Sequence, residues 1–234
     1  MNIVDIIAIV IILIGALSGL KKKTIKSLIQ LITLVATAIV AYQLTPLLGN
    51  FVIRKLPFFN FAGYADLYTL NIMFYRGVSF VLLFVILYCV LNILLDLSGI
   101  VEWLVGKILL IELPDRIIGA ILSAVETLFF VFIIGFVMLQ NPFTQKFVMD
   151  SSFVKTTVEK TPVVAKMFAL TTVSAEKIYD ILDAREEKYD PLDINMKVAT
   201  VIIQYSDSTD LINELIKNGK MHMDNVVFAS QKVK

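Results

Sequence analysis

The sequence has few of the residues on which catalytic and metal sites depend. Its 234 residues include one cysteine, one histidine and one tryptophan. Cys89 stands alone inside an apolar run, so it can form no disulfide within the chain, and the simplest interpretation is a small buried or lipid-facing residue. His222 has no second histidine beside it. We therefore predict no metal site and no cofactor.

The motifs of common enzyme classes are also missing. The sequence contains no Ser-His-Asp arrangement, phosphate-binding loop, zinc-ligand spacing or dinucleotide fingerprint, so we do not expect an enzyme. Nucleic-acid binding is not expected either. The net charge is only +1, and the one basic block, Lys21 to Lys23, lies between two apolar runs.

Charged residues are scarce overall and unevenly distributed. They make up 18% of the chain, whereas a soluble domain averages about 25% charged residues. Hydrophobic residues make up 58%, against an average of about 45–50%. Residues 1–140 hold nine Lys/Arg and seven Asp/Glu, against twelve and thirteen in residues 141–234. This shift predicts a membrane domain over 1–140 and a polar, mostly helical tail over 141–234.

Four apolar runs in the first domain have the length of membrane-spanning helices, which need about 20 mainly apolar residues. Proline follows the second run at Pro46 and the fourth at Pro142, and in each case we expect the helix to stop before it. The sequence therefore predicts an all-α polytopic membrane protein with four transmembrane helices, at about residues 3–20, 25–44, 72–95 and 117–139.

The distribution of lysines predicts the orientation of these helices. The connection after the first run contains Lys21, Lys22, Lys23 and Lys26, which should keep it cytoplasmic. Four spans then place both termini outside the cytoplasm, and the tail becomes available to an extracytoplasmic protein partner. Because these lysines follow the first apolar run instead of preceding it, we interpret residues 3–20 as a retained helix and not as a signal peptide.

Two connections are too apolar for ordinary loops. Residues 49–71 are rich in aromatic side chains, and residues 97–113 have apolar residues at helical spacing with Trp103 and Lys107 as anchors. We predict that both are helices lying in the membrane interface. A short fifth span through 97–113 is the alternative.

The tail shows three amphipathic patterns. The first follows Ser174, a candidate N-cap, and the second follows Pro191. The third begins with Ser208 or Thr209 as its cap and ends at Gly219.

Small residues in the spans predict close helix packing. Gly15 and Gly19 form a small-xxx-small pattern, and Gly119 lies near the start of the fourth run. Such a pattern lets two helices approach closely, within one chain or in a homo-oligomer, although glycine is also common in spanning helices by chance. If the contact exists, leucine at Gly19 should separate the helices, and alanine should do much less harm.

Glu126 is the candidate intramembrane polar site. It lies about 14 Å along the helix from Ile117, where a carboxylate costs on the order of 2.5–3.5 kcal/mol. Ser123 and Thr127 share nearly the same face, and Tyr88 or Asn92 of the third run lies within reach. Glu126 either handles a proton or an ion, or is a neutral acid hydrogen-bonded to a neighbouring helix for packing.

Asp5 and Arg76 form a second candidate site, near the outer ends of the first and third spans. They either make an interfacial ion pair or reach water separately.

The order of several short motifs resembles the colicin V production protein (CvpA) family. An acidic residue opens the first apolar helix, a glycine-rich helix end runs into a basic turn, and a charged turn with Gly-Ala starts the last helix. These motifs are Asn2-Ile3-Val4-Asp5-Ile6-Ile7, Gly15-Ala16-Leu17-Ser18-Gly19-Leu20-Lys21-Lys22-Lys23 and Asp115-Arg116-Ile117-Ile118-Gly119-Ala120. With the hydrophobic layout, the resemblance covers about residues 1–139. The chain departs from it at Ser123, Glu126 and Thr127, where family members tend to have glycine and a basic residue.

The resemblance implies an accessory or scaffold protein of the bacterial cytoplasmic (inner) membrane, needed for colicin V production and linked to envelope homeostasis. Some relatives carry a trypsin-like protease domain outside the cytoplasm after their four spans, which agrees with the orientation expected from the lysines. The resemblance supplies no catalytic residues. The alternative function is a small transporter or channel that uses Glu126 as its coupling group.

Overall fold

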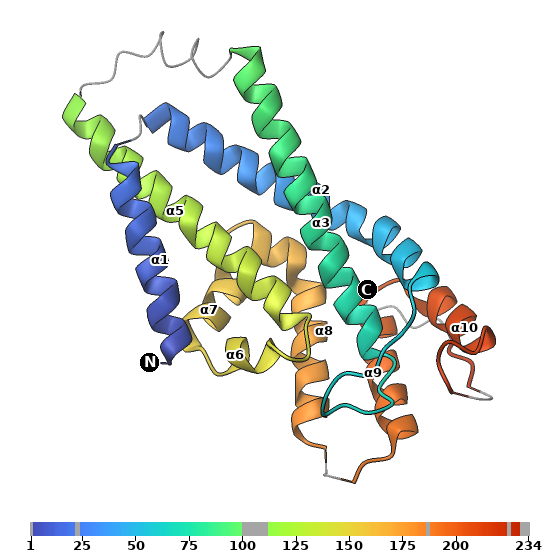
Figure 1. Ribbon diagram of the computed structural model, residues 1–234. Helices are drawn as coiled ribbons and strands as arrows, with labels where there is room; N and C mark the ends of the chain where they lie inside the picture. Colours follow the sequence, from blue (N-terminus) through green and yellow to red (C-terminus); the bar gives the residue numbers. More distant parts are fainter. Residues whose placement is uncertain (1, 22–23, 100–111, 186–187, 224–225, 230–234) are drawn as a thin grey trace.

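The computed structural model describes residues 2–21, 24–99, 112–185, 188–223 and 226–229, with side chains left undescribed at 112–115. These residues fold almost entirely into helices, which confirms the predicted all-α class, and one isolated β-bridge joins Phe61 to Tyr64. The helices are α1 (Ile3–Gly19), α2 (Thr24–Lys55), α3 (Leu70–Ser98), α5 (Glu112–Leu139), α6 (Gln145–Met149), α7 (Ser152–Lys160), α8 (Val164–Asp183), α9 (Pro191–Tyr205) and α10 (Thr209–Lys217) (Figure 1).

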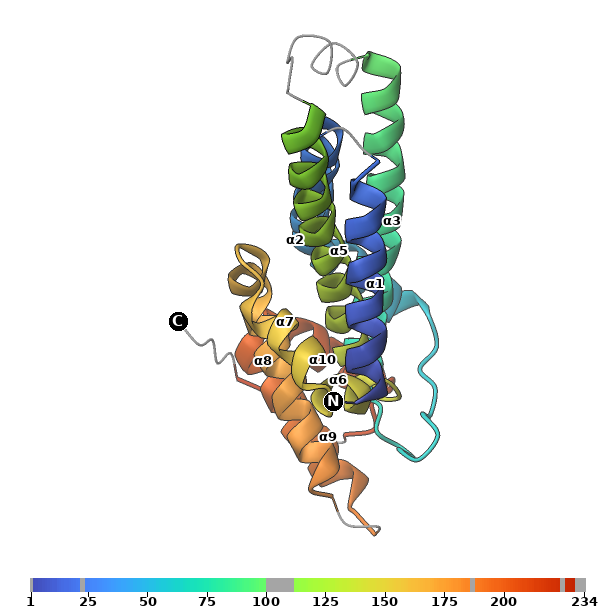
Figure 2. The ribbon, with the colours of Figure 1, turned by 90° about the vertical axis from the view of Figure 1, so that its left-hand side faces the viewer.

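Three helices, α2, α3 and α5, are long and apolar enough to cross a membrane. The first predicted span corresponds to α1, which is apolar but has 17 residues, a length of about 25 Å. Figure 2 shows these four helices extending from one end of the molecule, while α6 to α10 gather at the other end beside the start of α1. The start of α1 and the tail therefore lie at the same end.

The prediction that Pro46 stops the second span is wrong. The helix α2 continues to Lys55, with Pro46 inside it. Proline in a helix forfeits one backbone hydrogen bond and costs about 3 kcal/mol or more. Packing beyond the proline offsets this cost, because Ile53 is fully buried and Gly49 lies against Arg76 of α3.

The predicted interfacial helix over residues 49–71 is also wrong. Its first part belongs to α2, and residues 56–69 form an irregular connection that turns at Gly63 and Asp66, both with positive φ. Asn71 holds the segment in place, since its side chain accepts from Phe59 N–H (3.2 Å) and donates to Phe59 O (2.9 Å). The second predicted interfacial segment, 97–113, falls largely outside the described residues.

Helices occur in the tail near each amphipathic pattern, with one corrected start. The helix α9 begins at Pro191 and α10 at Thr209, as predicted, and Gly219 turns the chain after α10 with φ +68°. The N-cap assigned to Ser174 is wrong, because α8 begins ten residues earlier, at Val164, and continues through that position. The turn at residues 161–163, and not Ser174, therefore precedes the start of this helix.

Candidate functional site at the junction of the membrane helices and the tail

Phe168 of α8 links the tail to the hydrophobic core of the membrane helices. Its side chain is fully buried. The ring lies 4.2 Å from Tyr42 of α2, 5.8 Å from Phe80 of α3 and 4.7 Å from Phe136 of α5, measured between ring centroids. Because one tail residue contacts three membrane helices, the core is continuous across the composition boundary at residue 141.

The far end of the tail is fixed to the end of α2. Lys220 Nζ donates to the carbonyl oxygens of Ile53 (2.6 Å) and Arg54 (2.9 Å). Arg54 also forms an ion pair with Glu214 of α10 at 2.9 Å. The last carbonyls of α2 are thus satisfied by a cation, which the dipole of the helix favours at this end.

Asp5 connects the start of α1 to the start of α7. Its carboxylate accepts from the backbone N–H groups of Asn2 (2.7 Å) and Phe153 (3.0 Å), and from the hydroxyl of Ser151. Ser151 is the N-cap of α7 and accepts from Val154 N–H at 3.1 Å. One buried carboxylate therefore serves the N-termini of two helices, where negative charge is favourable.

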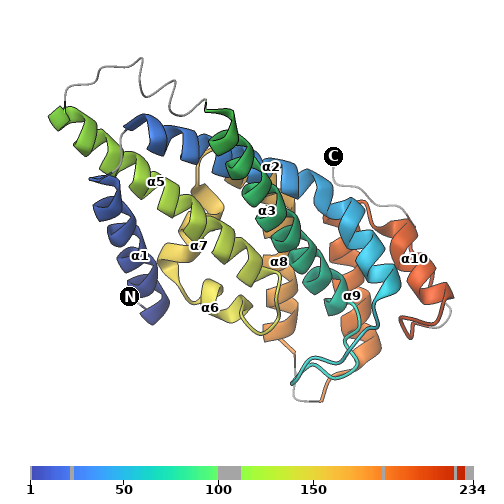
Figure 3. The ribbon, with the colours of Figure 1, turned by 45° about the horizontal axis from the view of Figure 1, so that its top comes forward.

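Arg76 contacts a different part of the tail. Its two terminal nitrogens donate to the hydroxyls of Ser206 (2.8 Å) and Ser208 (2.6 Å), in the turn between α9 and α10. The structure does not bring Asp5 and Arg76 together as an ion pair. The reason is the helix order, since α5 lies between α1 and α3 (Figures 1 and 3). Each residue instead binds the tail.

A cavity of about 330 Å³ lies beside Arg76, between the membrane helices and the tail. Its walls come from α2, α3, α5, α8 and α9, and most are apolar. The lining includes Arg76 and the apolar or aromatic residues Tyr42, Phe80, Phe136, Leu170 and Ile178. The sequence singled out Arg76 as a charge in an apolar run, but it gave no signal for the tail serines that hold it.

The three predicted packing glycines meet at the contact between α1 and α5. A Cβ atom added at Gly15 would lie 1.9 Å from Thr127 Oγ1, and one at Gly19 would lie 2.5 Å from the carbonyl oxygen of Gly119. Ser123 lies equally close, with its Cβ 2.6 Å from the Cβ that Gly19 lacks. These two helices pack closely enough to leave no space for side chains at the glycines.

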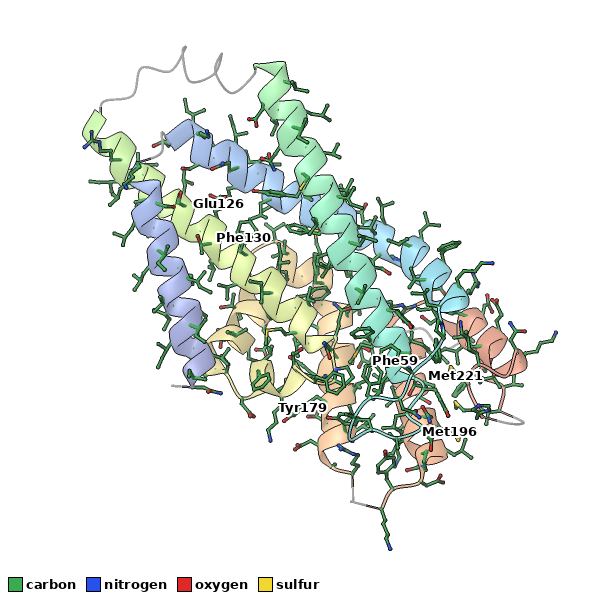
Figure 4. All side chains as sticks on the ribbon, viewed as in Figure 1. Phe59, Glu126, Phe130, Tyr179, Met196 and Met221 are labelled. Atoms are coloured by element: carbon green, nitrogen blue, oxygen red, sulfur yellow. The ribbon has the colours of Figure 1, made fainter. Side chains whose placement is uncertain are left out.

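The polar residues near Glu126 are divided among several helices. Ser123 Oγ lies 3.3 Å from Ser27 Oγ of α2, and Thr127 donates to its own helix at Ser123 O. Asn92 likewise donates to its own helix, at Tyr88 O. Glu126 is 7% exposed and interacts electrostatically with Tyr88 of α3. Figure 4 shows Glu126 on the half of α5 away from Tyr179 and Met196 of the tail.

The remaining predicted residues lie apart from this junction. Lys21 is exposed at the connection between α1 and α2, Lys26 is exposed in the first turn of α2, and Lys22 and Lys23 lie outside the described residues. Within the described parts of the chain, no group of three or more His, Cys, Asp or Glu residues is arranged to hold a metal ion.

A family model described as "Colicin V production protein" matches residues 4–162, which extends past the membrane helices to the end of α7. No curated protein and no solved structure matches the chain.

Proposed function

The chain belongs to the colicin V production protein family, and on this premise we propose that it is a membrane accessory protein that supports toxin export and envelope homeostasis. It works as a scaffold in the bacterial cytoplasmic membrane and has no catalytic activity. Its four apolar helices all cross the bilayer, α1 included, with both termini outside the cytoplasm.

The fixed position of the tail carries this proposal. Asp5, Phe168 and Arg76 attach it to α1, to the core and to α3, so it is not a flexible appendage. A protein partner that binds the tail outside the cytoplasm is thereby held at a defined position over the membrane helices. This is what a scaffold for an export apparatus requires.

The test is a bacterial strain that carries a colicin V operon and lacks its own family member. Supplying this chain should restore secreted toxin activity and growth in the presence of detergent. A variant with Phe168→Ala, which loosens the tail, should restore less than Met167→Ala, which changes an exposed neighbour on the same helix. If the strain that lacks its family member secretes as much toxin and resists detergent as well as the strain supplied with this chain, the proposal is refuted.

A second candidate function is a small transporter or channel, and the burial of Glu126 in the middle of α5 favours it. A group that must gain and lose a proton cannot be replaced by glutamine, whereas a neutral acid that only makes hydrogen bonds can. We expect Glu126→Gln to keep both stability and activity. A folded but inactive Gln variant, together with proton flux through the wild-type protein in liposomes, would favour the transporter.

A further inference from the structure

No acidic side chain among the described residues forms an ion pair with Arg76. Its side chain donates to two neutral serine hydroxyls, and Nε is buried with no hydrogen-bond partner among the described residues. A guanidinium has five N–H donors, so several remain for another group. Burying a cation without a counter-charge is costly, which makes an anion in the adjacent cavity favourable.

The cavity matches a ligand with one charged end. Its apolar wall is formed by Tyr42, Phe80, Phe136 and Ile178, and Arg76 supplies the cation. A volume of about 330 Å³ is at the lower end of the usual range for small-molecule sites, about 300–1,000 Å³. Asp207 also lines the cavity, but its side chain is exposed to solvent at the rim.

The rim of the cavity includes exposed residues next to the surface of a helix that can span the membrane. Leu170 of α8 and Gln43 of α2 both line it and are exposed. On α2, the neighbouring Leu44 and Leu47 are exposed apolar residues of a helix that can span the membrane. A molecule with a hydrocarbon part can therefore enter sideways along this surface.

We propose that this cavity binds an anionic amphiphile, whose carboxylate or phosphate pairs with Arg76 while its hydrocarbon part lies against the aromatic wall. Arginine suits this role, because its planar fork matches both anions with two parallel hydrogen bonds. The ligand is either a membrane lipid or a free amphiphile, since the two share this chemistry.

The experiment is calorimetric titration of the purified full-length protein, in non-ionic detergent, with dodecanoate. Dodecanol, which has the same chain and no charge, is the matched control ligand. Wild type should bind dodecanoate at least tenfold more tightly than dodecanol. The variant Arg76→Gln should lose that preference, and Arg54→Gln, which removes an exposed arginine elsewhere, should keep it. The proposal would be overturned if wild type bound dodecanoate and dodecanol equally tightly. It would also be overturned if Arg76→Gln bound dodecanoate as tightly as wild type does.

Two additions keep the test decisive. If Arg76→Gln does not fold, Ser174→Phe fills the cavity from α8 and leaves the arginine in place, and it should weaken dodecanoate binding at least tenfold. Native mass spectrometry then identifies the source. Retention of phosphatidylglycerol by wild type and its loss in Ser174→Phe supports a lipid ligand. Binding of added dodecanoate without retained lipid supports a free amphiphile. If wild type retains no lipid and binds no dodecanoate, the proposal is overturned.

Discussion

At the scale of single residues, Gly19 sets the closest approach between two helices. Its missing side chain leaves room for the carbonyl oxygen of Gly119, 2.5 Å from where a Cβ would lie. The backbone cannot move aside as a flexible side chain can. Alanine at Gly19 should do less harm than leucine, but it is not free of cost, since even one methyl group must push α1 away from α5.

We accordingly predict that Gly19→Ala destabilises the protein by about 1–3 kcal/mol, the usual cost of overpacking. Thermal unfolding in detergent measures this as a lower Tm. Leu17→Ala is the control, because Leu17 is 63% exposed on the same helix and should tolerate the change. A Tm for Gly19→Ala equal to that of wild type would mean that the two helices are further apart than the structure has them.

At the scale of elements, α8 carries the aromatic attachment of the tail to the core of the membrane helices. One face of this helix carries Phe168 into the aromatic core, and the Tyr42 hydroxyl lies 2.9 Å from Thr171 Oγ1. The opposite face is exposed and includes Met167 and Leu170. A helix with one fully buried aromatic anchor depends strongly on it.

Phe168→Ala should cost about 3–5 kcal/mol, as is typical for a buried phenylalanine. We expect faster proteolysis of the α8–α9 region in addition to a lower Tm, because the anchor between tail and bundle is lost. Met167→Ala should change neither measurement noticeably. Equal protease resistance in the two variants would show that Phe168 does not hold the tail.

The pair of helices α7 and α8 also predicts a pH dependence. Burial raises the pKa of Glu176, the nearby Glu159 raises it further, and Lys155 acts in the opposite direction. The folded state therefore disfavours the charged form of Glu176 more than the unfolded chain does. Its contribution to stability is complete below the ordinary carboxyl pKa and is lost as the pH rises through the raised value.

Glu176→Gln should therefore be more stable than wild type at pH 7.5, with the difference shrinking towards pH 4. Thermal unfolding of both proteins at the two pH values checks this. Asp183→Asn, an exposed change on the same helix, should show no such trend. A Gln variant that is less stable than wild type at pH 7.5 would contradict the assigned cause.

At the scale of the whole molecule, the sequence predicts the apolar helices well and their assembly poorly. The bounds of α3 and α5 follow from long apolar runs, and α9 starts at its proline as expected. The path of α2 beyond Pro46 does not follow, because it depends on packing against α3 that no local signal encodes.

The junction of bundle and tail was hidden for the same reason. Arg76 and Ser206 are 130 residues apart in the chain, and no spacing rule connects them. Phe168 precedes Ser174, so it lies outside the amphipathic pattern that the sequence indicates for this helix. Asp5 and Arg76 stand out in the sequence as charges at span ends, but their partners come from parts of the tail that only the tertiary structure brings near.

In the proposed topology, four helices cross the membrane and the tail lies outside the cytoplasm. Cysteine labelling tests this topology, in a Cys89→Ser background with an impermeant thiol reagent on intact spheroplasts. Asp210→Cys, exposed at the start of α10, should be labelled before lysis, and Asp96→Cys, exposed near the end of α3, only after it. The reverse pattern would invert the orientation, and identical labelling of both positions would contradict the four-span arrangement.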